Sequence, residues 1–330
     1  MRTGMRVWAA AIAALLLGVG AAQAQDCGLK QYDSLTMEVY PDRLLLPVTL
    51  GTVPKKMILR LEDAVNGMDA AAASALDLRI TSIPPNIHFH RGGEEITRIA
   101  HVPEMHFGRQ TMKNVEFLMV RAGHYDDEAV GDLGTQMFQK VDYELDIAGA
   151  KFNLFSPDHC PGKTVYWTKT PFAELPLKPS PELTYIRTEM MLDDHPVTVA
   201  LSTVGRSRIG MNAMRRLFNV DENSPELTVV GQDLLGHKTY RYAFKTLTAG
   251  GLTINNPAIM VYDEEPRPGC NDKLHFAMPE PSAFHTSDRP QLARCFGGDD
   301  AVLGLSVLSK LHIYVSGQEK KLYLTSAEAK

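Results

Sequence analysis

The chain has 330 residues, 44% of them hydrophobic and 22% charged, and a formal net charge of −5 at pH 7. This length is too great for a small disulfide-stapled domain and allows one large or two medium domains with a sizeable core. The acidic balance argues against nucleic-acid binding, which depends mainly on a basic surface that faces phosphate.

The first 24 residues have the three parts of a secretory signal peptide. Arg2 and Arg6 supply the positive start, VWAAAIAALLLGVG the apolar run, and AQA at positions 22–24 the cleavage site. A retained membrane anchor is the alternative, but the run is shorter than the roughly 20 residues that a bilayer span needs. We therefore expect a mature chain that begins at Gln25, has no transmembrane segment and is periplasmic or secreted.

The mature chain matches itself in two places. Residues 50–78 align without gaps with residues 192–220, at an offset of 142, and each copy reads as a hairpin turn, a β-rich run, a loop and a helix-like segment. Residues 132–155 align with residues 302–325, at an offset of 170, and each copy reads as a short helix followed by strand, turn and strand. This pattern predicts a duplicated β-rich lobe rather than alternating strands and helices.

The repeat divides the chain into a signal peptide (1–24), an N-terminal lobe (25–160), a connector (161–183) and a C-terminal lobe (184–330). The connector is assigned from its many prolines, which favour an irregular segment. In the middle of the first lobe, Gly92-Gly93 is predicted to form the tip of a hairpin.

The four cysteines are an even number in a chain that we expect to be exported, and they predict disulfides. Three pairings are possible, and no two cysteines have the C-x-x-C spacing of a zinc site. We predict the pairs that stay inside one half of the repeat, because the first would tie the N-terminus to the end of the first lobe and the second would brace the longer middle of the second lobe. These pairs are Cys27–Cys160 and Cys270–Cys295.

With the repeat established, the chain resembles bacterial exported members of the retropepsin-like and pepsin-like aspartic protease family. Each lobe of that family contributes an Asp-Thr-Gly loop, a helix and an apolar-apolar-Gly segment, for which this chain has DLG at 132–134 and VLG at 302–304. The resemblance covers most of the mature chain. It implies an all-β monomer of two similar lobes with short helices, a cleft between the lobes, a flap at Gly92-Gly93 and no cofactor.

The two signature loops depart from the family pattern. On the repeat alignment, the Asp-Thr-Gly triplets fall on Arg60-Leu61-Glu62 and Ser202-Thr203-Val204. Both expected aspartates are absent, whereas the family mechanism needs two close carboxyl groups that share a proton. An arginine stays protonated and a serine cannot replace a carboxylate as the base. Only Thr203 keeps the family pattern, so we expect no catalytic residue.

Three other kinds of chemistry are weaker alternatives. Glu62 and Asp63 could supply relocated carboxylates, but no Asp or Glu occurs between Val197 and Val220 in the second lobe. Ser202 as a nucleophile lacks the G-x-S-x-G context, so a hydrogen bond to nearby backbone is the better interpretation. A metal site could form from one histidine cluster, although we expect none; its members are His88, His90, His101 and His106.

Arg60 has two possible roles. It could form an ion pair with Glu62 or Asp63, which we favour, or it could bind a ligand carboxylate on the floor of the cleft. The sequence therefore predicts an exported, catalytically inactive protein that binds a peptide or a periplasmic protein. An active peptidase with relocated carboxylates and a structural envelope protein with a filled cleft are the alternatives. The predicted binding residues are Arg60, Leu61, Glu62, Gly92, Gly93, Ser202, Thr203 and Val204.

Overall fold

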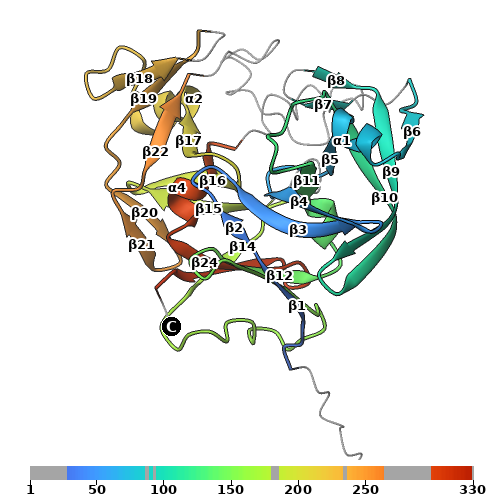
Figure 1. Ribbon diagram of the computed structural model, residues 1–330. Helices are drawn as coiled ribbons and strands as arrows, with labels where there is room; N and C mark the ends of the chain where they lie inside the picture. Colours follow the sequence, from blue (N-terminus) through green and yellow to red (C-terminus); the bar gives the residue numbers. More distant parts are fainter. Residues whose placement is uncertain are drawn as a thin grey trace, which may run out of the picture.

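The computed structural model describes residues 28–85, 89–91, 94–179, 186–232, 236–263 and 299–328. Within these residues the chain is all-β and two-lobed, with only short helices, so the predicted fold class is confirmed (Figure 1). The predicted signal peptide and Gly92-Gly93 lie outside the described residues, as do Cys27, Cys270 and Cys295. None of the helices described is long and apolar enough to cross a bilayer.

The N-terminal lobe is built on an eight-stranded sheet. Its strand β3 also pairs with β9, where Thr49 lies opposite His106, so the sheet curls until two of its strands meet. Leu44, Leu46 and Val48 point inward from β3 and are buried in the main core. In spatial order the strands are β2 (Glu38–Val39), β3 (Leu44–Leu50), β4 (Val53–Arg60), β11 (Gly131–Gly134), β5 (Gly67–Asp69), β10 (Gln110–Val120), β9 (Arg98–Phe107) and β6 (Arg79–Ser82).

The C-terminal lobe is built on a nine-stranded sheet with the same central order. Its strands β16, β23, β17 and β22 repeat the order of β4, β11, β5 and β10, and each pair keeps its parallel or antiparallel direction. In spatial order the strands are β18 (Thr228–Gln232), β19 (Lys238–Arg241), β22 (Ile259–Tyr262), β17 (Ser207–Gly210), β23 (Ala301–Leu303), β16 (His195–Leu201), β15 (Arg187–Leu192), β20 (Thr246–Ala249) and β21 (Leu252–Asn255).

The strand register tests the two offsets of the internal repeat. Leu59 lies opposite Leu133 in the first lobe, and Leu201 lies opposite Leu303 in the second. These residues are related by 142 and by 170, so the pairing confirms both offsets.

The gap-free alignment is wrong beyond the signature loops. Gly67 lies opposite Asp132, but its equivalent opposite Val302 is Arg208, at an offset of 141. The first loop therefore contains one more residue than the second. The short helices follow the shifted offset, because α1 (Ala70–Ala75) corresponds to α2 (Met211–Ala213), which continues as the π-helix η2 (Met214–Phe218).

A six-stranded sheet joins the two lobes (Figure 1). Its central strands come from different halves of the repeat and run antiparallel, with Leu145 opposite Ile313. Both side chains are buried in the main core. A strand of this sheet, β14, falls inside the predicted connector. In order the strands are β1 (Gln31–Thr36), β13 (Lys151–Phe155), β12 (Asp142–Asp146), β24 (Leu311–Ser316), β25 (Lys321–Ser326) and β14 (Ala173–Pro176).

The segment 159–167, which runs from the end of the predicted N-terminal lobe into the connector, covers polar side chains of this sheet. His159 contacts the buried Asp142 carboxylate at 2.7 Å, and both side chains are only 1% exposed. Trp167 stacks on His312, with 4.2 Å between the ring centroids, and His312 contacts the Glu144 carboxylate at 2.5 Å. This segment is therefore held on the sheet by a buried ionisable group and an aromatic group.

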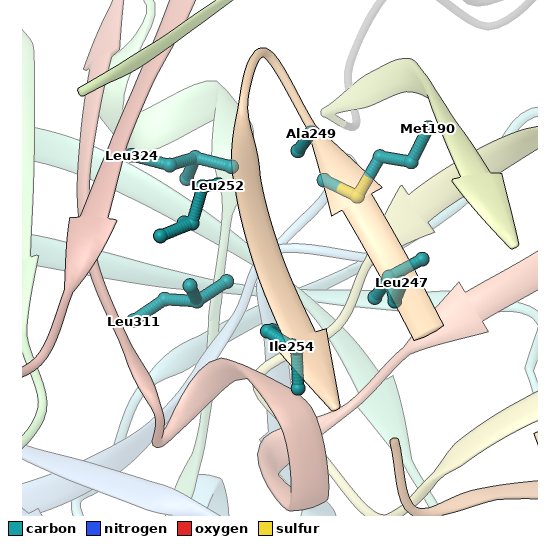
Figure 2. A pocket seen from close by; sticks show the side chains of 7 residues that line it. All are labelled: Met190, Leu247, Ala249, Leu252, Ile254, Leu311 and Leu324. Carbon is teal, nitrogen blue, oxygen red and sulfur yellow. The ribbon is translucent and has the colours of Figure 1, made fainter. Parts of the chain in front are cut away.

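Packing between the second lobe and the six-stranded sheet is tight and apolar. The β20–β21 hairpin meets β24 and β25 around a space of about 10 Å³ (Figure 2). This space is too small and too apolar to hold a ligand. It is lined by Met190, Leu247, Ala249, Leu252, Ile254, Leu311 and Leu324.

Candidate functional site

The two signature loops meet through Thr203. Its hydroxyl donates a hydrogen bond to the carbonyl oxygen of Leu59 at 2.6 Å and accepts one from the backbone N–H of Leu61 at 3.1 Å. All three residues are fully buried. One side chain of the second lobe thus holds the end of β4 and the start of the loop that follows it. The Leu61 side chain lies in the core and has no hydroxyl that could form the reciprocal hydrogen bonds to the second loop.

Arg60, at the end of β4, is occupied by two carboxylates of its own lobe. Its Nε lies 2.9 Å from Glu62 Oε1, and its Nη1 lies 3.4 Å from Asp132 Oδ2. Asp132 is fully buried and also accepts hydrogen bonds from the Gly67 N–H and the Tyr125 hydroxyl. The ion-pair role of Arg60 is therefore the one whose contacts are present, with the predicted partner Glu62 and, in addition, the buried Asp132.

Glu62 is the carboxyl group placed where the two lobes meet. Burial raises the pKa of Glu62 above its ordinary value, although the Arg60 guanidinium and the nearby Ser202 hydroxyl lower it in part. Among the described residues, Glu62 Oε2 has no hydrogen-bond partner. One oxygen of Glu62 is thus neutralised by Arg60, and the other is buried without a donor.

Ser202 is directed into its own loop. Its hydroxyl donates to the carbonyl oxygen of Val204 at 2.8 Å and accepts from the Val204 N–H at 3.1 Å. The bond to nearby backbone that we expected from the sequence is therefore present. The first lobe also holds this loop, because the Gly205 N–H donates to the Asp42 carbonyl at 2.7 Å.

Glycines let β11 and β23 approach the backbone of the two loops. A Cβ atom at Gly134 would lie 2.7 Å from the carbonyl oxygen of Ala64, and one at Gly304 would lie 2.5 Å from that of Gly205. Real Cβ atoms do not come so close to backbone atoms. Both lobes therefore need glycine at the end of the apolar-apolar-Gly segment.

The predicted hairpin is present around the glycine pair. Strands β7 (Phe89–Arg91) and β8 (Glu94–Ile96) are antiparallel, with Arg91 opposite Glu94. Phe89 and Ile96 pack in a small cluster with Val65 and Tyr125, close to the first loop. The tip itself, Gly92-Gly93, lies outside the described residues, and its role as a flap stays a prediction.

A groove of about 370 Å³ begins two residues after the second loop. It crosses one face of the four strands β17, β22, β19 and β18. Arginine, hydroxyl, amide and apolar groups line it, and no described lining residue is acidic. The lining residues are Arg206, Ser207, Arg208, Val230, Gly231, Gln232, Thr239, Met260 and Tyr262.

Comparisons with known proteins agree with this architecture. No protein-family model matches the sequence, and no curated protein does. Among solved structures, the chain is similar to the aspartic proteinase from Irpex lacteus, with a TM-score of 0.51 over 90% of this chain and 98% of that one. The chain has a pepsin-like fold. The two sequences are only 10% identical, so this likeness establishes the fold alone.

Within this pepsin-like fold, the structure gives the predicted site residues different positions. Leu61, Glu62, Ser202 and Thr203 are brought together where the loops meet, whereas Arg60 turns to carboxylates of the first lobe. Val204 lies beside them and forms an isolated β-bridge with Arg43.

Sequence reasoning missed Asp132. Its signal was available, because an aspartate replaces the first apolar residue of the apolar-apolar-Gly segment, and a buried carboxylate needs partners. The groove was also missed, since the strands that line it, from β17 to β22, are far apart in the chain.

The other predicted sites have few described members. His101 contacts Thr81 and Glu116, while His106 contacts Glu104 and Thr111. No group of metal-binding side chains occurs among the residues that the structure describes. Cys160 is described and is not a free cysteine, but its predicted partner is not among the described residues, so the disulfide pairing stays a prediction.

Proposed function

We propose that this chain is an exported, non-hydrolytic protein with a pepsin-like fold, which binds a peptide or an extended segment of an envelope protein between its lobes. The export follows from the signal-like first 24 residues. The absence of hydrolysis follows from the groups at the meeting point of the two loops, and the binding of peptide from the groove beside the second loop.

The observation that carries the proposal is the contact of Thr203 with Leu59 and Leu61. It joins the two loops next to Arg60 and Ser202. This contact supports the assignment of these two residues to the positions of the expected acids. Paired-acid hydrolysis needs one carboxyl group to activate water while the other polarises the scissile carbonyl. Arg60 cannot accept a proton, and the Ser202 hydroxyl is bonded to Val204.

Peptide binding is supported by the groove beside the second loop. It is long enough to cross four strands and combines apolar side chains with hydrogen-bonding groups, which is the character of ligand sites. Val230 on its rim is 40% exposed. All of its lining residues belong to the second lobe, so the groove offers a peptide a surface beside the second signature loop.

One observation favours the alternative of an active peptidase. Glu62 has a raised pKa and a buried oxygen without a donor, as a protonated catalytic carboxyl would. The second lobe offers no acid between Val197 and Val220 to act with it. We therefore treat hydrolysis as an outcome of the test.

The test incubates the purified mature protein with an unfolded protein at acidic pH, with and without pepstatin, and measures peptide binding in parallel. We expect binding without cleavage. We also expect that Arg60→Asp combined with Ser202→Asp restores little activity, because Leu61, Glu62 and Val204 still occupy the loops. Pepstatin-sensitive cleavage that disappears in Glu62→Gln would overturn the proposal and assign the chemistry to Glu62.

A further inference from the structure

Three arginines gather on the exposed face of the second lobe. Arg208 on β17 lies opposite Met260 on β22, and Met260 lies opposite Arg241 on β19, so the three side chains form one row on one face of the sheet. Arg206, in the segment before β17, lines the groove together with Arg208 and Met260, and Arg241 lies next to Met260 on the same face of the sheet. We name Arg206, Arg208, Arg241 and Met260 the arginine face.

The arginines of this face differ from those of the adjoining helix in their partners. Arg206, Arg208 and Arg241 are exposed, and none of them forms an ion pair in the described part of the chain. On the adjoining helix, by contrast, Arg215 pairs with Glu222 and Arg216 pairs with Asp300.

The surroundings of the arginines are those of a binding surface rather than of a solvated sheet face. Met260 separates two guanidinium groups, and Tyr262 and Val230 add apolar surface along the groove. The described lining contains no carboxylate, although the chain as a whole is acidic. Exposed cations around apolar groups suit a ligand that carries both acidic and apolar side chains.

We infer that the arginine face selects acidic peptide segments, in which carboxylate side chains flank an apolar residue that rests on Met260. This inference rests on the proposed function and names the class of peptide that the groove takes. Arg208 and Arg241 lie two strand spacings apart, with β22 between them, which is about 10 Å across the sheet. An extended peptide covers this distance in about three residues.

The test selects ligands from a degenerate ten-residue peptide library on the immobilised mature protein. We expect the selected sequences to be enriched in Asp and Glu at two positions, with an apolar residue between them. Fluorescence anisotropy then measures the affinity of one selected peptide and of its Asn and Gln counterpart. We expect the acidic peptide to bind at least tenfold more tightly and its affinity to fall as salt increases.

Variants of the full chain show which residues cause the preference for the acidic peptide. Arg208→Ala and Arg241→Ala should each weaken the acidic peptide about tenfold and leave the neutral peptide nearly unchanged. Arg79→Ala is the matched control, because Arg79 is also an exposed strand arginine but belongs to the first lobe. Arg208→Lys should restore part of the affinity, since it keeps the charge and loses the bidentate geometry.

Four results would overturn the inference. Equal binding of acidic and neutral peptides, or equal losses of affinity in Arg79→Ala and Arg208→Ala, would refute the role of the arginine face and leave the proposed peptide binding intact. A library that yields no binding peptide would instead refute the proposed function together with this inference. Tighter binding of a single-stranded oligonucleotide, lost in Arg208→Ala, would show that the face reads phosphate and not peptide carboxylates.

Discussion

The contact between the lobes through Thr203 leads to a quantitative prediction for Thr203→Val. The substitution keeps the shape of the side chain and removes the hydroxyl that donates to Leu59 and accepts from Leu61. The Leu61 N–H then loses its acceptor, and the Leu59 carbonyl loses a donor, in a fully buried place. A buried polar group left unpaired costs about 1–3 kcal/mol, so the free energy of unfolding should fall by about 2–4 kcal/mol.

Two control variants separate the hydroxyl from the packing around it. Thr203→Ser keeps the hydroxyl and deletes one buried methyl group, which should cost about 1 kcal/mol. Thr188→Val removes a buried hydroxyl that donates one hydrogen bond to the Pro176 carbonyl, at the end of β14 in the six-stranded sheet. It should cost about 1–2 kcal/mol, because no backbone N–H is orphaned.

Equilibrium unfolding in urea, followed by far-ultraviolet circular dichroism, measures the three values under the same conditions. The order that we expect is Thr203→Val largest, then Thr188→Val, then Thr203→Ser. If Thr203→Val destabilises the protein no more than Thr203→Ser does, the hydroxyl does not hold the loops together, and the identification of Arg60 and Ser202 as equivalent positions loses its support.

Three further predictions concern other parts of the molecule. Burial lowers the pKa of His159, but its bond to Asp142 contributes to a net rise. The stabilising effect of His159 should thus be complete below about pH 6.5 and be lost as pH rises through the folded-state pKa. Trp167 fluorescence should follow this loss. Fluorescence that does not change with pH, or a pH profile that is the same in His159→Gln, would contradict the prediction. Gly304→Ala should lower the free energy of unfolding by about 1–3 kcal/mol, whereas Gly231→Ala, which meets no atom within 4 Å, should not. Mass mapping of non-reduced peptides should find the predicted disulfides Cys27–Cys160 and Cys270–Cys295. A Cys160–Cys270 link would refute this pairing.

The sequence alone was sufficient for the architecture, because the features that define it are local. Alternating apolar residues, turn glycines and two matched segments predicted two β-rich lobes, and the strand register bears out both offsets. The position of the signature loops followed from the same pattern, down to the single threonine that could still link them.

Only the tertiary structure decided which side chains meet at these positions. Arg60 finds Asp132, which is 72 residues away in sequence, because β4 and β11 pair in parallel and bring the ends of both strands together. Arg208 and Arg241 share one row because β22 enters the sheet between β17 and β19. Hydrophobic periodicity indicates that a segment is a strand and which of its faces is buried. It does not predict which strand lies beside it or in which register, and these two properties determine which charged side chains meet at the site.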